Sequence, residues 1–134
     1  MCLLDQVTDW DDQRIACLAR SHRDADNPLR AHGRLASVCG IEYAAQAMAI
    51  HGTLLAPADP DGAPRAGYLA SVRSVSLTVA TLDDQTEDLH IEAERLSGSD
   101  NTILYAFRVC SAESELISGR ASVILDADAL APRA

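Results

Sequence analysis

The fold of this chain is decided by one Ala-rich stretch, SVCGIEYAAQAMAIHGTLL, at residues 37–55. Its residues are apolar almost all round, and the stretch is longer than an ordinary strand, so it predicts a single buried helix. Ser37 has a side chain suited to an N-cap. Gly40 weakens the first turn, and we expect it where backbone or a ligand approaches closely.

The segments on either side of this helix have the pattern of strands. Residues 3–7 and 14–20 predict a strand pair around the polar turn 8–13. Four long antiparallel strands are predicted after the helix, at residues 67–79, 89–96, 102–110 and 116–125. In the second of these strands, apolar and polar residues alternate, so we expect one face of the sheet to be exposed to solvent and the other to pack on the helix. The sequence therefore predicts an α+β domain in which a sheet wraps one helix.

The length of 134 residues fits one compact domain, which we place at residues 1–126, followed by a tail at residues 127–134. Residues 21–35 and 57–64 have the composition of loops, and long ordered loops often carry function. A sheet of this size leaves one edge open, and open edges are usually paired or covered. We therefore expect a dimer at least.

Composition excludes several classes of function. A formal charge of −9 argues against nucleic-acid binding. All 11 basic residues are Arg, which excludes lysine Schiff-base chemistry. No signal peptide or membrane-spanning stretch is evident, so we expect a cytoplasmic protein. The four widely spaced cysteines predict reduced, mostly buried thiols and no metal site: Cys2, Cys17, Cys39 and Cys110.

Glu42 is the most informative residue, because it places a carboxylate in an otherwise apolar helix, on one stripe with Gln46. Burial would raise its pKa and make it a general acid or base near neutral pH. A solvated strip, or an ion pair with an Arg, is the alternative interpretation. No serine-nucleophile elbow or phosphate-binding glycine loop occurs, which leaves proton transfer or ligand binding along the helix.

A second catalytic group would come from the loop before the helix, where His32 is the candidate and an exposed loop histidine is the alternative. His22, beside Arg23 and Asp24 in the same loop, is a further candidate base, and a structural imidazole held by these charges is the alternative. The helix start offers backbone N–H groups around Cys39, Gly40 and Ile41 that would polarise a thioester carbonyl.

Three segments together resemble the hotdog-fold 3-hydroxyacyl-acyl-carrier-protein dehydratases, above all the branch associated with aryl polyene biosynthesis. They are residues 3–7 (LLDQV), residues 27–30 (NPLR), and GRL at residues 33–35 followed by GIEYAAQA at residues 40–47. The resemblance covers nearly the whole chain. The Glu-x-x-x-Gln signature is shared with some thioesterases of the same fold.

The resemblance implies a long helix wrapped by a curved antiparallel sheet of about five to six strands, with the acyl chain entering where two subunits join. It implies Glu42 as the helix carboxylate of the site, and adds Asn27 and Gln46 to the substrate-binding candidates. In the better-known dehydratases a His-Phe-Pro-Gly loop precedes the carboxylate. This chain has His32-Gly33-Arg34-Leu35 instead. Either His32 fills that role, or the catalytic histidine is absent.

The implied reaction is elimination of water from a 3-hydroxyacyl thioester, as in fatty-acid or polyene biosynthesis, without a metal or redox cofactor. The implied partners are an acidic acyl carrier protein and a second hotdog subunit, either identical or different. A basic patch would then receive the carrier, and its candidates, which are otherwise ordinary surface residues, are Arg23, Arg30, Arg34, Arg65 and Arg73. A thioesterase and a catalytically silent acyl-binding subunit remain as alternatives.

Overall fold

The computed structural model describes residues 2–55, 67–99 and 102–125. The elements, in chain order, are strands β1 (Gln6–Trp10) and β2 (Arg14–Ala19), the 3₁₀ turns η1 (Ser21–Arg23) and η2 (Ser37–Cys39), helix α1 (Gly40–Leu55), and strands β3 (Gly67–Leu77), β4 (Leu89–Ser99), β5 (Thr102–Ser111) and β6 (Ser114–Leu125). The predicted loop at residues 57–64 and the predicted tail at residues 127–134 lie outside the described residues.

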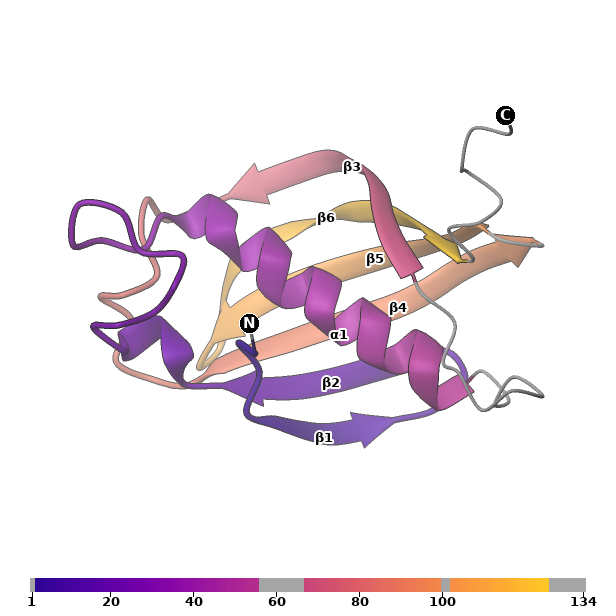
Figure 1. Cartoon of the computed structure of the whole chain (residues 1–134), viewed down its shortest axis with the longest axis horizontal. Coiled ribbons are helices and arrows are strands. Elements are labelled where there is room, and N and C mark those ends of the chain that lie inside the picture. Colours follow the sequence, from indigo (N-terminus) through magenta and orange to yellow (C-terminus); the bar gives the residue numbers. More distant parts are fainter. Residues whose placement is uncertain (1, 56–66, 100–101, 126–134) are drawn as a thin grey trace, which may run out of the picture.

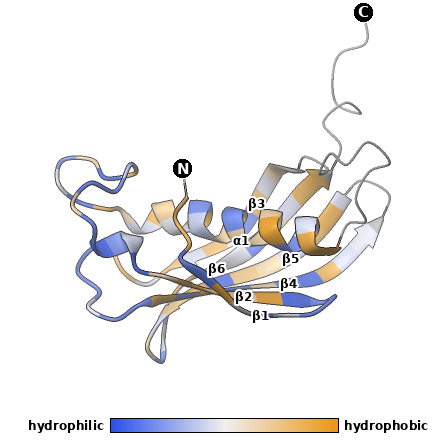
Figure 2. Cartoon of the chain, turned by 60° about the horizontal axis from the view of Figure 1, so that its bottom comes forward, coloured by the Kyte–Doolittle hydropathy of each residue, from blue (hydrophilic) through white to orange (hydrophobic). Residues whose placement is uncertain are grey.

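The six strands form one antiparallel sheet in the order β1-β2-β4-β5-β6-β3, and α1 lies across one face of it (Figure 1). This confirms the α+β architecture expected from the sequence. Within the described residues, no second helix or sheet covers the other side of α1 (Figure 2). None of the helices described is long and apolar enough to cross a membrane.

One face of α1 carries the residues that pack on the sheet. The buried helix residues recur at the spacing of an amphipathic helix: Gly40, Tyr43, Ala44, Ala47, Met48 and His51. The opposite face is exposed at Glu42, Ala49 and Thr53. The prediction of a helix buried all round is therefore wrong for the single chain, because small alanines made both faces look alike in the sequence.

At Gly40 the helix backbone packs closely against a side chain of the sheet. A Cβ at this position would overlap Ile117 Cδ1 on β6, although its φ of −61° is ordinary helical backbone. The expected close approach is therefore between helix backbone and a core side chain, and a larger residue would push α1 off the sheet.

The strand boundaries differ most from expectation at β1, which begins at Gln6 and not at Leu3, and at the end of β4. β1 extends through Trp10, and the turn shrinks to residues 11–13, where Asp11 Oδ1 accepts hydrogen bonds from the N–H groups of Gln13 (2.8 Å) and Arg14 (2.9 Å). β4 continues through Gly98, whose backbone pairs with Ile103. In both places pairing with a neighbouring strand overrides a polar or glycine-containing sequence.

The two edges of the sheet are β1 and β3. Three large aliphatic residues of β3 are exposed: Leu69 (40%), Val75 (38%) and Leu77 (46%). The pairing of β3 with β6 shifts register twice, and Ser74 lies in the left-handed region at φ 56°. β3 is therefore a bent edge with apolar side chains that no other described element covers.

Candidate functional site

The segment before α1 is tied to the β3–β4 connection, and this fixes the helix start. The Leu35 N–H donates to Asp83 Oδ1 (2.8 Å), and the Ser37 N–H donates to the Ala80 carbonyl (2.9 Å). The 3₁₀ turn η2 then leads directly into α1, so Ser37 begins this turn and is not the helix N-cap predicted from the sequence.

Glu42 lies in the first turn of α1 on the helix face that points away from the sheet. Its side chain is exposed and makes no hydrogen bond or ion pair with any described residue. Val38, one turn earlier, is 53% exposed, and Ala45 and Ala49 follow on the same side. The single chain therefore presents a carboxylate on an apolar stripe, and the expected burial of Glu42 is not supplied by the chain itself.

Two of the backbone donors expected at the helix start are already used. The Cys39 N–H donates to the Ala36 carbonyl (3.0 Å), and the Gly40 N–H donates to the carbonyls of Ser37 and Val38. The 3₁₀ turn satisfies these groups, so the expectation of free N–H groups fails for Cys39 and Gly40. Ile41 is half-buried and packs against the core.

His32 occupies the tip of a miniature hairpin in the long loop. Ala31 and Arg34 exchange backbone hydrogen bonds (2.9 and 3.0 Å), while His32 (φ 55°) and Gly33 (φ 75°) form the tight turn between them. The imidazole is exposed, and His32 makes no hydrogen bond or ion pair with Glu42. Within one chain the two catalytic candidates are thus not paired.

Asn27 is buried and anchors the same loop to α1. Its side-chain amide donates to the Tyr43 hydroxyl (3.0 Å) and to the Ser21 carbonyl (2.7 Å), and its Oδ1 accepts from the Leu29 N–H (2.9 Å). Burial raises the pKa of the Tyr43 hydroxyl. The anchoring role of Tyr43 was not predicted from the sequence. The signal for it was a tyrosine directly after Glu42 in the predicted helix.

Gln46 also serves the protein's own packing, since its Oε1 accepts a hydrogen bond from the Leu3 N–H (2.9 Å). His22 is fully buried, with Nε2 bonded to the Gln85 carbonyl (3.0 Å). Desolvation lowers the pKa of His22, and its Nδ1 has no hydrogen-bond partner among the described residues. A base in this position has no access to substrate in the single chain.

Three of the predicted carrier-binding arginines have partners in their own chain. Arg23 pairs with Asp88 (2.7 Å) and Arg34 with Asp83 (2.8 Å). Arg30 donates to the carbonyls of the loop that contains it. These guanidinium groups stabilise the long loop and its neighbours.

The other two arginines differ from these three. Arg65 lies outside the described residues. Arg73, on β3, is exposed and makes no ion pair within the described part of the chain.

The thiols also differ from expectation: only Cys17 is fully buried, with its pKa raised to about 11 by desolvation, and Cys2 is exposed.

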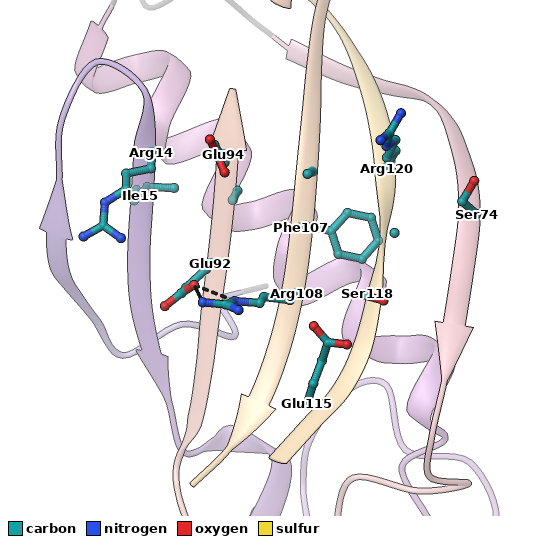
Figure 3. Close-up of a pocket in the computed structure, with 13 residues that line it drawn as sticks. Arg14, Ile15, Ser74, Glu92, Glu94, Phe107, Arg108, Glu115, Ser118 and Arg120 are labelled. Atoms are coloured by element: carbon teal, nitrogen blue, oxygen red, sulfur yellow. Dashed lines mark hydrogen bonds and ion pairs between the residues drawn. The ribbon is translucent and has the colours of Figure 1, made fainter. Parts of the chain in front are cut away.

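An open groove of about 490 Å³ lies on the face of the sheet opposite α1 (Figure 3). Its lining includes charged residues on β4, β5 and β6, among them Glu92, Arg108 and Arg120. Glu42 and His32 are not among its lining residues. The groove and the predicted helix-start site are therefore separate features.

Known structures share this architecture. A dehydratase heterocomplex, ApeI:P from Xenorhabdus doucetiae, matches with a TM-score of 0.76 and 23% identity over 92% of this chain and 82% of that one. A mutant thioesterase from Pseudomonas aeruginosa matches with a TM-score of 0.66 and 12% identity over 90% and 80% of the two chains. A hypothetical thioesterase protein with coenzyme A from Streptococcus pneumoniae matches with a TM-score of 0.66 and 12% identity over 90% of this chain and 86% of that one. Comparison with curated proteins gives no match.

One long helix packed on a six-stranded antiparallel sheet, together with these neighbours, places the chain in the hotdog fold class. The chain belongs to the ApeP-like family, described as ApeP dehydratase, whose pattern matches residues 1–131. The resemblance stated from the sequence is thereby confirmed at the level of fold and family.

Proposed function

We propose that this chain is a subunit of a dehydratase that eliminates water from a 3-hydroxyacyl thioester carried on an acyl carrier protein, in aryl polyene or fatty-acid type biosynthesis. The observation that carries the proposal is the family match over residues 1–131 combined with Glu42 in the first turn of α1. That carboxylate stands on an exposed apolar stripe, as expected of a site that a second subunit covers.

In the proposed step a base removes a proton from C2, the C2–C3 double bond forms, and the 3-hydroxyl leaves as water. Glu42 in its acid form donates the proton that the leaving hydroxyl needs. The step requires proton transfer alone. Its products are an enoyl thioester and one water molecule.

The chain lacks two things for this step that a partner would supply. The first is burial of Glu42, whose side chain is exposed in the described chain. The second is a base beside it, because no imidazole of the described chain bonds to Glu42. His32 on its hairpin tip, or a group from another hotdog subunit, is the proposed base, in a homodimer or heterodimer.

Two other functions have specific support. A thioesterase is favoured by the neighbouring thioesterase structures, and Glu42 would then activate water or attack the thioester. A silent acyl-binding subunit is favoured because His32 makes no hydrogen bond or ion pair with Glu42 in the described chain and because the chain has no His-Phe-Pro-Gly loop. The dehydratase and the thioesterase give different products, and the silent subunit gives none.

The test incubates the chain, alone and with a hotdog partner subunit, with a 3-hydroxyacyl carrier protein, and identifies products by mass spectrometry. Enoyl product that is lost in Glu42→Gln supports the dehydratase, and free acid with free thiol supports the thioesterase. No product from the chain alone, with enoyl product from the mixture that Glu42→Gln does not change, supports the silent subunit.

Glu42→Gln should keep the fold and lower turnover by at least about 100-fold, since it removes an acid–base group. The matched control is Glu113→Gln, which makes the same change in the exposed β5–β6 turn. Full activity of Glu42→Gln would remove Glu42 from the site. His32→Ala should lose activity only if His32 is the base.

A further inference from the structure

Two arginines face each other on the outer side of the sheet, with no acidic partner among the residues that the structure describes. Arg73 on β3 and Arg120 on β6 are direct cross-strand partners, and both are exposed. Neighbouring Val72 packs towards the core, so Arg73 points to the face opposite α1. Figure 3 shows Arg120 beside Ser74 on that face, with α1 behind the sheet.

Five of the other described arginines have acidic partners, Arg30 donates to backbone carbonyls, and Arg95 has no recorded ion pair among the described residues. The ion pairs recorded among the described residues occupy Arg14, Arg20, Arg23, Arg34 and Arg108. In the cross-strand row of Arg120, the next carboxylate is Glu94, two strands away at roughly 10 Å. Like charges directly opposite each other destabilise a sheet unless an anion lies between them.

Hydroxyl groups surround the two guanidinium groups. Ser71 and Ser122 are cross-strand partners two positions further along β3 and β6, on the same face as the arginines. Ser74 lies in the bulge of β3 at φ 56°, a conformation that a serine adopts only at some cost in stability. These residues line a hollow of about 400 Å³ that adjoins the larger groove at Arg120.

We propose that Arg73 and Arg120, with the hydroxyls of Ser71, Ser74 and Ser122, form a binding site for a phosphate group. Facing cross-strand residues have Cβ atoms about 4.5–5.5 Å apart, so both guanidinium forks reach one tetrahedral anion. Phosphate offers several acceptor oxygens and a charge that neutralises the facing pair. The site does not depend on Glu42.

A phosphate ester has two sources here. One is free or nucleotide-borne phosphate, as in coenzyme A. The other is the phosphodiester that joins a pantetheine arm to a carrier protein, and this second source rests on the proposed function.

The test measures binding of inorganic pyrophosphate by calorimetry in low-salt buffer. The variant Arg73→Gln/Arg120→Gln should weaken binding at least about tenfold, because it removes both charged donors. The control Arg14→Gln/Arg20→Gln removes the same charge from arginines that already have acidic partners, and should change binding less than about threefold. Equal weakening in both double variants, or no binding by the unmodified protein, would overturn the proposal.

Thermal unfolding gives a second readout that separates binding from folding. Pyrophosphate should raise the Tm of the unmodified protein and leave that of the site variant unchanged. Without ligand, the site variant should melt no lower than the unmodified protein, because it relieves repulsion between the arginines. If the double variant does not fold, Arg120→Gln alone serves in its place.

The source of the phosphate is identified by two further titrations. Weaker binding of coenzyme A by the site variant supports a nucleotide source, and weaker binding only of carrier protein bearing the pantetheine arm supports the carrier. The pyrophosphate titration measures binding without turnover. Failure of the proposed dehydratase would leave that binding unchanged, so the two failures are distinguishable.

Discussion

At the scale of single residues, Asp83 shows how one carboxylate holds the start of α1. Its Oδ1 accepts from the Leu35 N–H (2.8 Å), and its Oδ2 pairs with Arg34 Nε (2.8 Å). The hydrogen bond from the Leu35 N–H and then the hydrogen bond from Arg34 lower the pKa of the Asp83 carboxyl below its ordinary 3.8. The folded protein thus favours the ionised form.

Asp83→Ala should lower the free energy of unfolding at pH 7 by about 1–2 kcal/mol, through loss of the charged acceptor. The sign follows from the lowered pKa: the contribution is complete above the unfolded value near 3.8 and is lost as pH falls through the folded value. Urea unfolding at pH 7 and in strong acid checks this. Asp84→Ala, exposed and 4.0 Å from Arg34, is the control, and an equal deficit at both pH values would contradict the account.

At the scale of elements, hydrophobic periodicity predicted the helix and five of the six strands closely, because an element that is buried on one face has apolar residues at a regular spacing in its sequence. β1 was less well placed, since its polar residues become a strand only by pairing with β2. The use of the helix-start N–H groups by η2 was not predicted, because it depends on the anchoring of residues 35–37 to the β3–β4 connection. The burial of Glu42 depends on what covers the outer face of α1, and the sequence pattern of one chain does not reveal that.

The long loop offers a test at this scale. Asn27→Ala should lower the free energy of unfolding by about 1–3 kcal/mol, because it leaves the Ser21 carbonyl and the Tyr43 hydroxyl short of a donor. It should also speed proteolysis of residues 21–36. Asp26→Ala, at the exposed neighbouring position, should change neither; unchanged stability of Asn27→Ala would refute the anchoring role.

At the scale of the whole molecule, two surfaces carry exposed aliphatic side chains that no other described element covers: the outer stripe of α1 around Glu42 and the edge strand β3. Both carry aliphatic side chains in a protein of charge −9. Solvent-exposed apolar edges favour association with another chain. The proposed partner subunit would cover both.

Val75→Lys should weaken self-association, or association with a hotdog partner, by at least about tenfold, because it places a charge on the apolar edge. Gln6→Lys adds the same charge to the opposite edge strand β1 and is the matched control. Light scattering across a range of concentrations measures the effect. Equal association of both variants would show that β3 is not the joining edge.

The turn at His32 and Gly33 has a consequence for anyone who engineers this protein. A histidine in the left-handed region is less stable there than glycine or asparagine would be. A selection for heat resistance alone would therefore tend to replace the histidine at position 32. The thermal stability of the fold would rise, and the imidazole that is the proposed base would be lost.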